Sequence, residues 1–184
     1  MTEVIKLASA SPERLAILED LGYAVDVCPV DLDETPMEDE SASQLVLRLA
    51  REKMRASHGI AGWTIAADTV VEVSGEVKGK PKNEDEARAT LLSLQQAEIT
   101  VWTATAMTSP EGEEMLDVSS AELTAKIWSM DEVEQYLRSQ LWKGRAGSFS
   151  IFHDPTPVIL KKGRLDVVRG LNGQAVLKAI GEVG

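Results

Sequence analysis

The sequence has little cysteine, little histidine and no long hydrophobic run. Its single cysteine, Cys28, excludes an internal disulfide framework and a zinc centre built on cysteines. Two histidines far apart in the chain do not suggest a metal site. No apolar run approaches the roughly 18 residues of a membrane span, and no signal-peptide pattern opens the chain. We therefore expect a cytoplasmic protein without a membrane partner.

Basic residues are outnumbered by acidic ones. The chain holds 19 Lys and Arg against 30 Asp and Glu, a formal net charge of −11 at pH 7. This charge repels nucleic acid at long range, so we expect no polynucleotide partner. A small anion is still possible, because a few converging cations override the global field at short range. With 184 residues, 43% of them hydrophobic, we expect one globular domain over residues 1–184.

Hydrophobic spacing and capping patterns predict a mixed α/β fold. Helix starts are predicted at Pro12, Ser41, Asn83, Ser129 and Asn172. The predicted strands are Val4–Ala8, Tyr23–Val27, Thr64–Ala67, Thr69–Val73, Glu76–Lys78, Ile99–Thr108, Glu114–Trp128, Ser148–Phe152, Val158–Lys161 and Leu165–Val168.

The first candidate site is the segment Ser9–Arg14, where a loop of small residues leads into a helix. The helix N-terminus offers backbone N–H groups and a positive dipole end to an anion. Ser9 adds a hydroxyl and Arg14 a guanidinium that suits phosphate. An ordinary Ser-Pro helix start is the simpler interpretation of the segment taken alone, and Glu13 would be repelled by a phosphate that faced it.

The second candidate is an acidic loop that contains Asp31, Asp33 and Glu34. Its carboxylates could bind a hard divalent cation, which prefers oxygen ligands. Neighbouring residues of an extended chain point in opposite directions, so only some of the three can serve one site. A solvated acidic loop is the alternative interpretation.

The third candidate is Asp68, a carboxylate inside the apolar segment Ala66–Val71. A buried acid is usually paired with a cation or functional. After the next turn, Lys78 and Lys80 flank a glycine, which is a weak signal of phosphate contact. The spacing is not that of a P-loop.

Taken together, these segments resemble the Maf family of nucleoside triphosphate pyrophosphatases, also called septum formation inhibitor proteins. The motifs that carry the resemblance are Leu7–Arg14, Asp33–Glu34, Leu49–Lys53, Ala67–Val71, Gly79–Pro81, Gly144–Ile151 and Val168–Leu171. The resemblance implies an elongated α/β fold with a mixed, curved sheet, flanking helices and a cleft between two lobes, related to the inosine triphosphate pyrophosphatases. It also implies hydrolysis of a nucleoside triphosphate to the monophosphate and pyrophosphate, a divalent metal cofactor (Mg²⁺ or Mn²⁺) and a possible homodimer.

The resemblance also assigns site residues position by position. Asp68 matches the family's general base, and Glu34 matches its metal-associated carboxylate; the two together would hold the metal. Lys53 and Lys80 match catalytic cations of the triphosphate pocket. The substrate-binding set that we carry over or infer is Ser9, Glu13, Arg14, Thr69 and Phe152.

Two of these positions depart from the family pattern. The family usually has Arg in place of Glu13, and Gln or Glu in place of Phe152, whereas Thr69 agrees with the branch that acts on thymidine and uridine triphosphates. A carboxylate at Glu13 accepts hydrogen bonds and Phe152 offers a stacking face, so we expect a shift towards purine or modified-purine triphosphates. Alternatively, Glu13 turns to solvent and Arg14 alone faces the ligand.

Two other functions stay open at this stage. A nucleotide-binding regulator of cell division that has lost turnover would also conserve nucleotide contacts. In a purely structural interpretation, Asp68 pairs with Lys53 or Lys80 inside the core, which explains a buried charge but not the ordered motifs.

Overall fold

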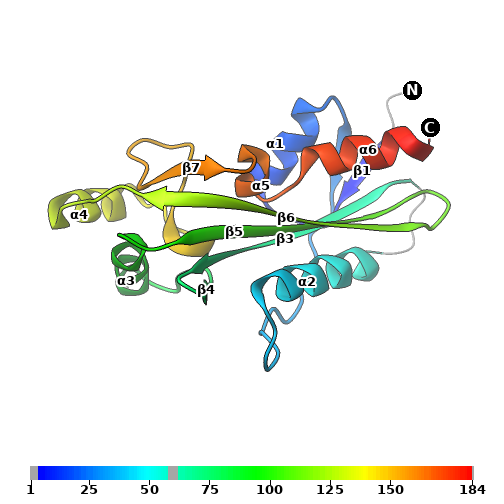
Figure 1. The fold of residues 1–184 in the computed structure, drawn as a ribbon. Coiled ribbons are helices and arrows are strands. Elements are labelled where there is room, and N and C mark those ends of the chain that lie inside the picture. Colours follow the sequence, from blue (N-terminus) through cyan, green and yellow to red (C-terminus); the bar gives the residue numbers. More distant parts are fainter. Residues whose placement is uncertain (1–3, 58–61, 184) are drawn as a thin grey trace. The chain divides into compact units, whose positions relative to one another are not determined.

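A computed structural model describes residues 4–57 and 62–183 (Figure 1). Within these described ranges fourteen elements follow one another, and strands and helices alternate over much of their length. They are β1 (Val4–Leu7), α1 (Pro12–Asp20), β2 (Ala24–Val27), α2 (Ala42–Ala56), β3 (Thr64–Val73), β4 (Glu76–Lys78), α3 (Glu84–Leu94), β5 (Ile99–Thr108), β6 (Glu114–Ala125), α4 (Met130–Ser139), the 3₁₀-helix η1 (Ala146–Ser148), β7 (Val158–Lys162), α5 (Leu165–Arg169) and α6 (Gly173–Val183).

The strands form one mixed sheet of seven strands. Its order is β2-β1-β3-β5-β6-β7, and β4 pairs with β3 outside this path. β1 runs parallel to both β2 and β3, whereas the pairs β3–β4 and β6–β7 are antiparallel. The prediction of an α/β fold with a mixed sheet and flanking helices is confirmed. None of the described helices is long and apolar enough to cross a membrane.

The contacts of the chain divide it into two compact units, each built from separate segments. Unit 1 comprises Met1–Thr69, Thr103–Ser119 and Arg169–Gly184, and unit 2 comprises Val70–Trp102 and Ser120–Val168. Strands β3, β5 and β6 each contribute residues to both units. The single domain over residues 1–184 stays a prediction.

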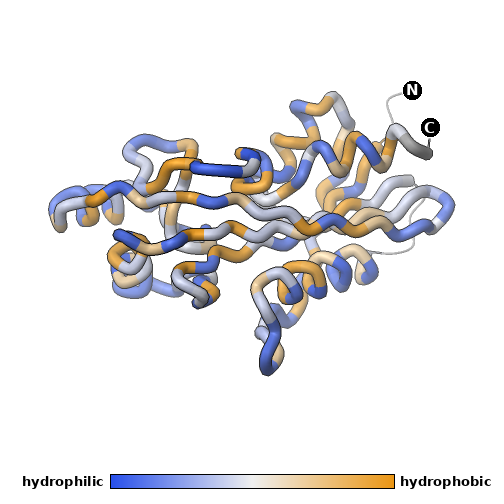
Figure 2. The backbone as a smooth tube through the Cα atoms, in the orientation of Figure 1, coloured by the Kyte–Doolittle hydropathy of each residue, from blue (hydrophilic) through white to orange (hydrophobic). Residues whose placement is uncertain are grey.

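The core of unit 1 lies between its strands and two helices. Buried side chains of β1 and β3 pack against Ile17 and Leu18 of α1 and against Val176 and Ala179 of α6. Helices α1 and α6 lie on one side of these strands, and α2 lies on the other side (Figure 1). Hydrophobic and hydrophilic residues alternate along α2 (Figure 2), as expected for a helix with one buried face.

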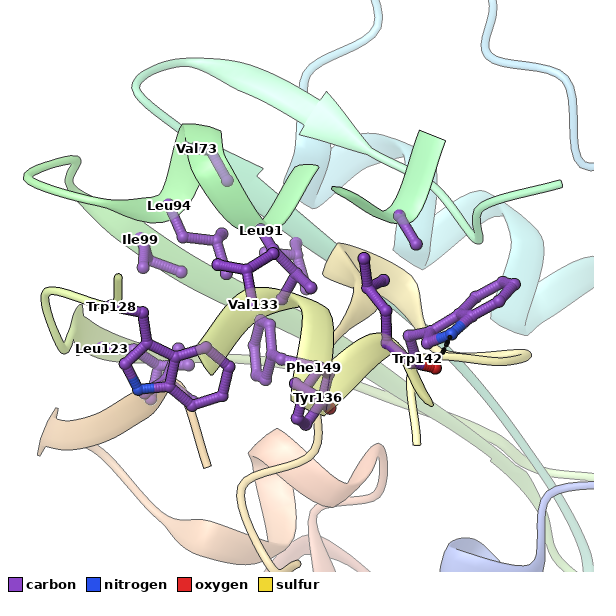
Figure 3. Close-up of a cluster of buried hydrophobic side chains, with 14 of the residues drawn as sticks. Val73, Leu91, Leu94, Ile99, Leu123, Trp128, Val133, Tyr136, Trp142 and Phe149 are labelled. Carbon is purple, nitrogen blue, oxygen red and sulfur yellow. Dashed lines mark hydrogen bonds between the residues drawn. The ribbon is translucent and has the colours of Figure 1, made fainter. Parts of the chain in front are cut away.

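The core of unit 2 is richer in aromatic side chains (Figure 3). The rings of Trp128 and Tyr136 lie 5.3 Å apart at a tilt of 58°. Polar atoms of two of these aromatic side chains have hydrogen-bond partners. The Tyr136 hydroxyl accepts a hydrogen bond from the backbone N–H of Ser150 at 2.8 Å, and Trp142 Nε1 donates to the carbonyl of Leu137 at 3.0 Å. Burial raises the pKa of Tyr136 to about 12, so this hydroxyl stays protonated at neutral pH.

Local signals predicted the helix starts correctly. Side chains of Ser11, Ser41, Asn83 and Ser129 cap helices α1, α2, α3 and α4. At α6, Asn172 Oδ1 accepts from two backbone N–H groups of the first turn.

Two predicted strands are wrong. Leu165–Val168 lies in the helix α5 (Leu165–Arg169), because a short apolar run fits either secondary structure. Ser148–Phe152 is not a strand: the 3₁₀-helix η1 ends at Ser148, and the chain then bends. Gly147 and Ser148 adopt positive φ angles of 69° and 61°, which an extended strand does not permit.

Candidate active site

The loop after β1 brings the first predicted site residues together. Ser11 caps α1, so the loop residues before it are held against the helix N-terminus. The hydroxyl of Ser9, a buried residue, accepts hydrogen bonds from the Ser11 backbone N–H at 3.2 Å and from Arg14 Nη1 at 3.0 Å. This arrangement lies at the carboxyl end of β1, the edge at which ligands of open α/β sheets bind.

The guanidinium of Arg14 is fixed by three acceptors in unit 1. Nε donates to the carbonyl of Gly170 at 2.8 Å, Nη1 to Ser9, and Nη2 to Thr69 Oγ1 at 3.3 Å. Thr69 Oγ1 also pairs with Thr103 Oγ1 at 2.9 Å. Each terminal nitrogen of a guanidinium carries two hydrogens, so one N–H on each has no acceptor among the described residues. Those two donors are available to an anion.

Lys53 is the second fixed cation, and the pattern of α2 puts it on the buried face. Leu49 and Val46, one and two turns earlier on the same face, are buried. Lys53 itself is only 7% exposed. Its ammonium therefore needs partners, and Nζ donates to Asp68 Oδ1 at 2.6 Å and to Glu34 Oε1 at 2.5 Å.

Asp68 reaches Lys53 because of the alternation along β3. Ile65 and Ala67 face the core shared with α1 and α6, so Asp68 points to the side of α2. Burial raises the pKa of Asp68, while the nearby charges of Lys53 and Arg14 oppose that rise. The carboxylate is thus buried in contact with Lys53, and the charge of Arg14 acts on it as well.

Thr69 follows Asp68 on β3 and points to the opposite face, where Arg14 contacts it. The Ser9–Arg14 group and the Lys53 group therefore contact two consecutive residues of one strand, and Arg14 and Asp68 are close enough for the charge of each to act on the pKa of the other. Burial lowers the pKa of Arg14, and the carboxylates of Asp68 and Glu34 raise it in opposition. A guanidinium stays protonated under such a shift, so Arg14 remains a cation.

The carboxylates of Glu34 and Asp68 fit a divalent cation. Both place an oxygen within 2.6 Å of the same Lys53 nitrogen, which shows that they converge on one positive centre. Among residues 4–57 and 62–183, no group of three or more His, Cys, Asp or Glu side chains could hold a metal. A pair of carboxylates completed by substrate phosphates is nevertheless the usual setting of Mg²⁺.

The neighbouring acid Asp33 is engaged elsewhere. Its Oδ1 accepts from Thr35 Oγ1 at 2.6 Å and from the Thr35 backbone N–H at 3.0 Å. These hydrogen bonds lower the pKa of Asp33. Of the acidic loop, the structure thus brings only Glu34 to Lys53 and Asp68.

The other predicted site residues lie elsewhere or carry unexpected contacts. Glu13 Oε2 accepts from Arg169 Nε at 3.1 Å, so its carboxylate is paired within unit 1. Lys80 and Phe152 belong to unit 2, where both are exposed. Their assignment to the site stays a prediction.

Three residues that contact the site had not been predicted: Thr103, Arg169 and Gly170. The segment Val168–Leu171 had been recognised only as a motif, with no role for its residues. Arg169 and Gly170 lie 156 residues from their partners Glu13 and Arg14, and a single sequence gives no signal for such pairs.

Comparisons with known proteins agree with the resemblance. The family model described as Maf-like protein matches residues 4–183. A dTTP/UTP pyrophosphatase of Zymomonas mobilis is 38% identical over 154 residues, covering 82% of this chain and 76% of the relative. A dTTP/UTP pyrophosphatase of Brucella abortus is 33% identical over 184 residues, covering 95% of this chain and 80% of the relative.

Solved structures give weaker matches. A HAM1 protein from Coxiella burnetii aligns with 16% identity and a TM-score of 0.46, covering 100% of this chain and 98% of that chain. This similarity is too low to support an argument about the site.

The raised pKa of Asp68 predicts that its ionised carboxylate lowers the free energy of unfolding at neutral pH. A carboxyl whose pKa is higher in the folded than in the unfolded state stabilises the fold when protonated, and this stability is lost as pH rises through the folded value. Asn cannot ionise, so Asp68→Asn should unfold at higher urea concentration than the wild type at pH 7. Below the ordinary value of 3.8 the difference should shrink.

Urea unfolding of both proteins at pH 7 and pH 3 measures this difference. Asp39→Asn is a matched control, because Asp39 is exposed in a loop at a φ of 58°, which Asn adopts readily. An Asp68→Asn variant that is less stable than the wild type at pH 7 would show that the ion pair with Lys53 outweighs burial.

Proposed function

The chain belongs to the Maf family, and from this we propose that it hydrolyses nucleoside triphosphates to the monophosphate and pyrophosphate. One observation carries the proposal: the buried Asp68 carboxylate, bound to Lys53, lies on β3 beside Thr69, which contacts Arg14. A general base for water is thus adjacent to a guanidinium with N–H donors available for phosphate oxygens. Phosphoryl transfer depends mainly on such positioning and charge neutralisation.

Asp68 would act as the general base. Its carboxylate takes a proton from a water molecule, the water oxygen bonds to phosphorus, and the bond from that phosphorus to the bridging oxygen breaks. Pyrophosphate leaves with the electron pair. Burial disfavours the ionised form of Asp68, in which a general base acts, whereas the charges of Lys53 and Arg14 favour it.

Glu34 and Asp68 would hold the divalent cation, Mg²⁺ or Mn²⁺. When bound, such an ion neutralises phosphate charge and orients the triphosphate. Ser9 and Arg14 would bind phosphate oxygens, and Lys80 would add a further cation. About half of the Glu34 side chain is exposed, so this carboxylate can exchange Lys53 for another cation without first being uncovered.

Thymidine and uridine triphosphates are the substrates that we place first. Thr69 agrees with that branch of the family, and the relatives from Zymomonas mobilis and Brucella abortus are named dTTP/UTP pyrophosphatases. The pairing of Glu13 with Arg169 offsets the negative charge that favoured a purine donor edge. The purine preference, the role of Phe152, the cytoplasmic location and a homodimer stay predictions.

A non-catalytic nucleotide-binding regulator is the second candidate function. The departure from the family at Glu13 and Phe152 supports it, because a changed binding site can lose turnover and keep affinity. The structural alternative, in which Asp68 only pairs with Lys53, accounts for the ion pair but not for Glu34 on the same ammonium or for the donors of Arg14.

Pyrophosphate release across a panel of nucleoside triphosphates tests the proposal. With Mg²⁺ or Mn²⁺ we expect one monophosphate and one pyrophosphate per triphosphate, and the highest kcat/KM for dTTP or UTP. GTP and methylguanosine triphosphate test the purine alternative. Nucleotide binding without release on every substrate would support the regulator, and neither binding nor release would support the structural alternative.

The role of Asp68 predicts a large loss of turnover in Asp68→Asn. The loss of a general base typically lowers the rate by about 10² to 10⁴. At saturating Mg²⁺ or Mn²⁺, nucleotide affinity should be largely kept, because Asn fills the same volume and excess metal offsets the weaker amide ligand. Measurement of kcat and of nucleotide affinity separates the two effects, and Asp39→Asn should behave as the wild type. Near-normal turnover would remove Asp68 from the mechanism.

The role of Glu34 predicts a changed metal requirement. A neutral amide binds a divalent ion less well than a carboxylate, so Glu34→Gln should need more Mg²⁺ or Mn²⁺ for half-maximal activity. Asp33→Asn is the matched comparison on the same loop and should leave the requirement unchanged, since Thr35 occupies its Oδ1. A raised metal requirement in Asp33→Asn, with an unchanged requirement in Glu34→Gln, would assign the ion to Asp33.

A further inference from the structure

We propose that Glu13 and Arg169 form a positioning pair that sets the guanidinium of Arg14, the phosphate-binding group of the proposed function. The proposal rests on that function for its kinetic consequence only. Two consecutive residues of α1 contact two consecutive residues before α6. Glu13 accepts from Arg169 Nε at 3.1 Å, and Arg14 Nε donates to the carbonyl of Gly170 at 2.8 Å. All four residues belong to unit 1.

The two contacts act on the same short segments and therefore support each other. The ion pair connects the residue before Arg14 to the residue before Gly170. Movement of the 169–170 segment away from α1 would break both contacts together. Both side chains of the pair are 23% exposed, so water screens their attraction less than it would at an open surface.

The close packing around Gly170 leaves the 169–170 segment little room to move. It adopts a φ of 105°, and a Cβ at this residue would lie 3.1 Å from Thr69 Oγ1 and 3.2 Å from Arg14 Nε. The backbone at Gly170 is thus packed against the guanidinium and against the hydroxyl that binds Nη2. A shift of this segment would reach Arg14 directly.

The pair also explains what a carboxylate does next to a phosphate-binding arginine. Glu13 alone would repel a triphosphate and could draw the Arg14 guanidinium away from its acceptors. Bound to Arg169, its charge is offset, and Nε of Arg14 keeps the Gly170 carbonyl. A second acid, Asp20, lies 3.7 Å from Arg169 Nη1 with its side chain 74% exposed, and it is too far away for a hydrogen bond.

Charge reversal tests the pair. Glu13→Gln and Arg169→Gln should each raise KM for dTTP or UTP about tenfold, the factor expected when one charge-assisted hydrogen bond is weakened, with kcat little changed. The double variant Glu13→Arg with Arg169→Glu should recover KM to within about threefold of the wild type, because the pair is restored with its charges exchanged. Asp20→Asn is the control and should leave KM unchanged.

Hydrogen exchange of the Arg14 Nε–H, followed by NMR in the free protein, gives a readout that needs no turnover. Its signal is assigned by its loss in Arg14→Lys. Exchange should be faster in both single variants and slow again in the double variant. If the wild type releases no pyrophosphate, the proposed function fails while this measurement still decides the pair.

Two outcomes would overturn the proposal. Unchanged exchange and KM in both single variants would show that the pair does not set Arg14. A Glu13→Gln variant that changes the ranking of dTTP, UTP and GTP, instead of raising all KM values alike, would return Glu13 to base recognition. Thermal unfolding checks each variant, and if one single variant does not fold, the other and the double variant decide.

Discussion

The Lys53 ammonium, bound between Asp68 and Glu34, is the interaction on which the candidate site depends. A lysine on the buried face of a helix is costly unless it is paired, and here each partner needs the pairing as well. Asp68 would be a buried charge on a central strand without it. The contact joins α2 to β3, and it opposes the rise in the pKa of Asp68 that burial causes.

Sequence reasoning succeeded where a feature is local. The cap at Ser41 depends on residues three positions apart, and Asp68 was recognisable because an acid interrupts an apolar strand. It failed where two structures share one pattern, as in Leu165–Arg169, whose short apolar run fits a strand or a helix turn. The contact between Glu13 and Arg169 depends on packing across 156 residues, which no local pattern encodes.

The difference between local features and long-range contacts also explains which site residues were predicted and which were missed. Ser9, Arg14, Glu34, Lys53, Asp68 and Thr69 come together within unit 1, on the loop after β1, the acidic loop, α2 and β3. The resemblance to the Maf family predicted these positions. Charge, burial and helix-terminus chemistry explained why most of them suit an anion-binding site. The hydrogen bond between Thr69 and Thr103 shows what was missing: Thr69 was predicted from the resemblance, but Thr103 looked like an ordinary strand residue, and only the sheet order β3-β5 makes the two neighbours.

Charge balance limits how this site can receive a polyanion. The ammonium of Lys53 and the guanidinium of Arg14 are matched by the carboxylates of Glu34 and Asp68, so these four groups sum to zero, and the pair formed by Glu13 and Arg169 adds nothing. The whole chain carries −11. A triphosphate therefore meets no net positive centre in these residues of unit 1. In the proposed function its charge would be offset by a divalent cation that enters with it, and the two carboxylates that face Lys53 would bind that cation. The absence of net positive charge in these residues is the reason that a divalent ion and a nucleotide would bind there together.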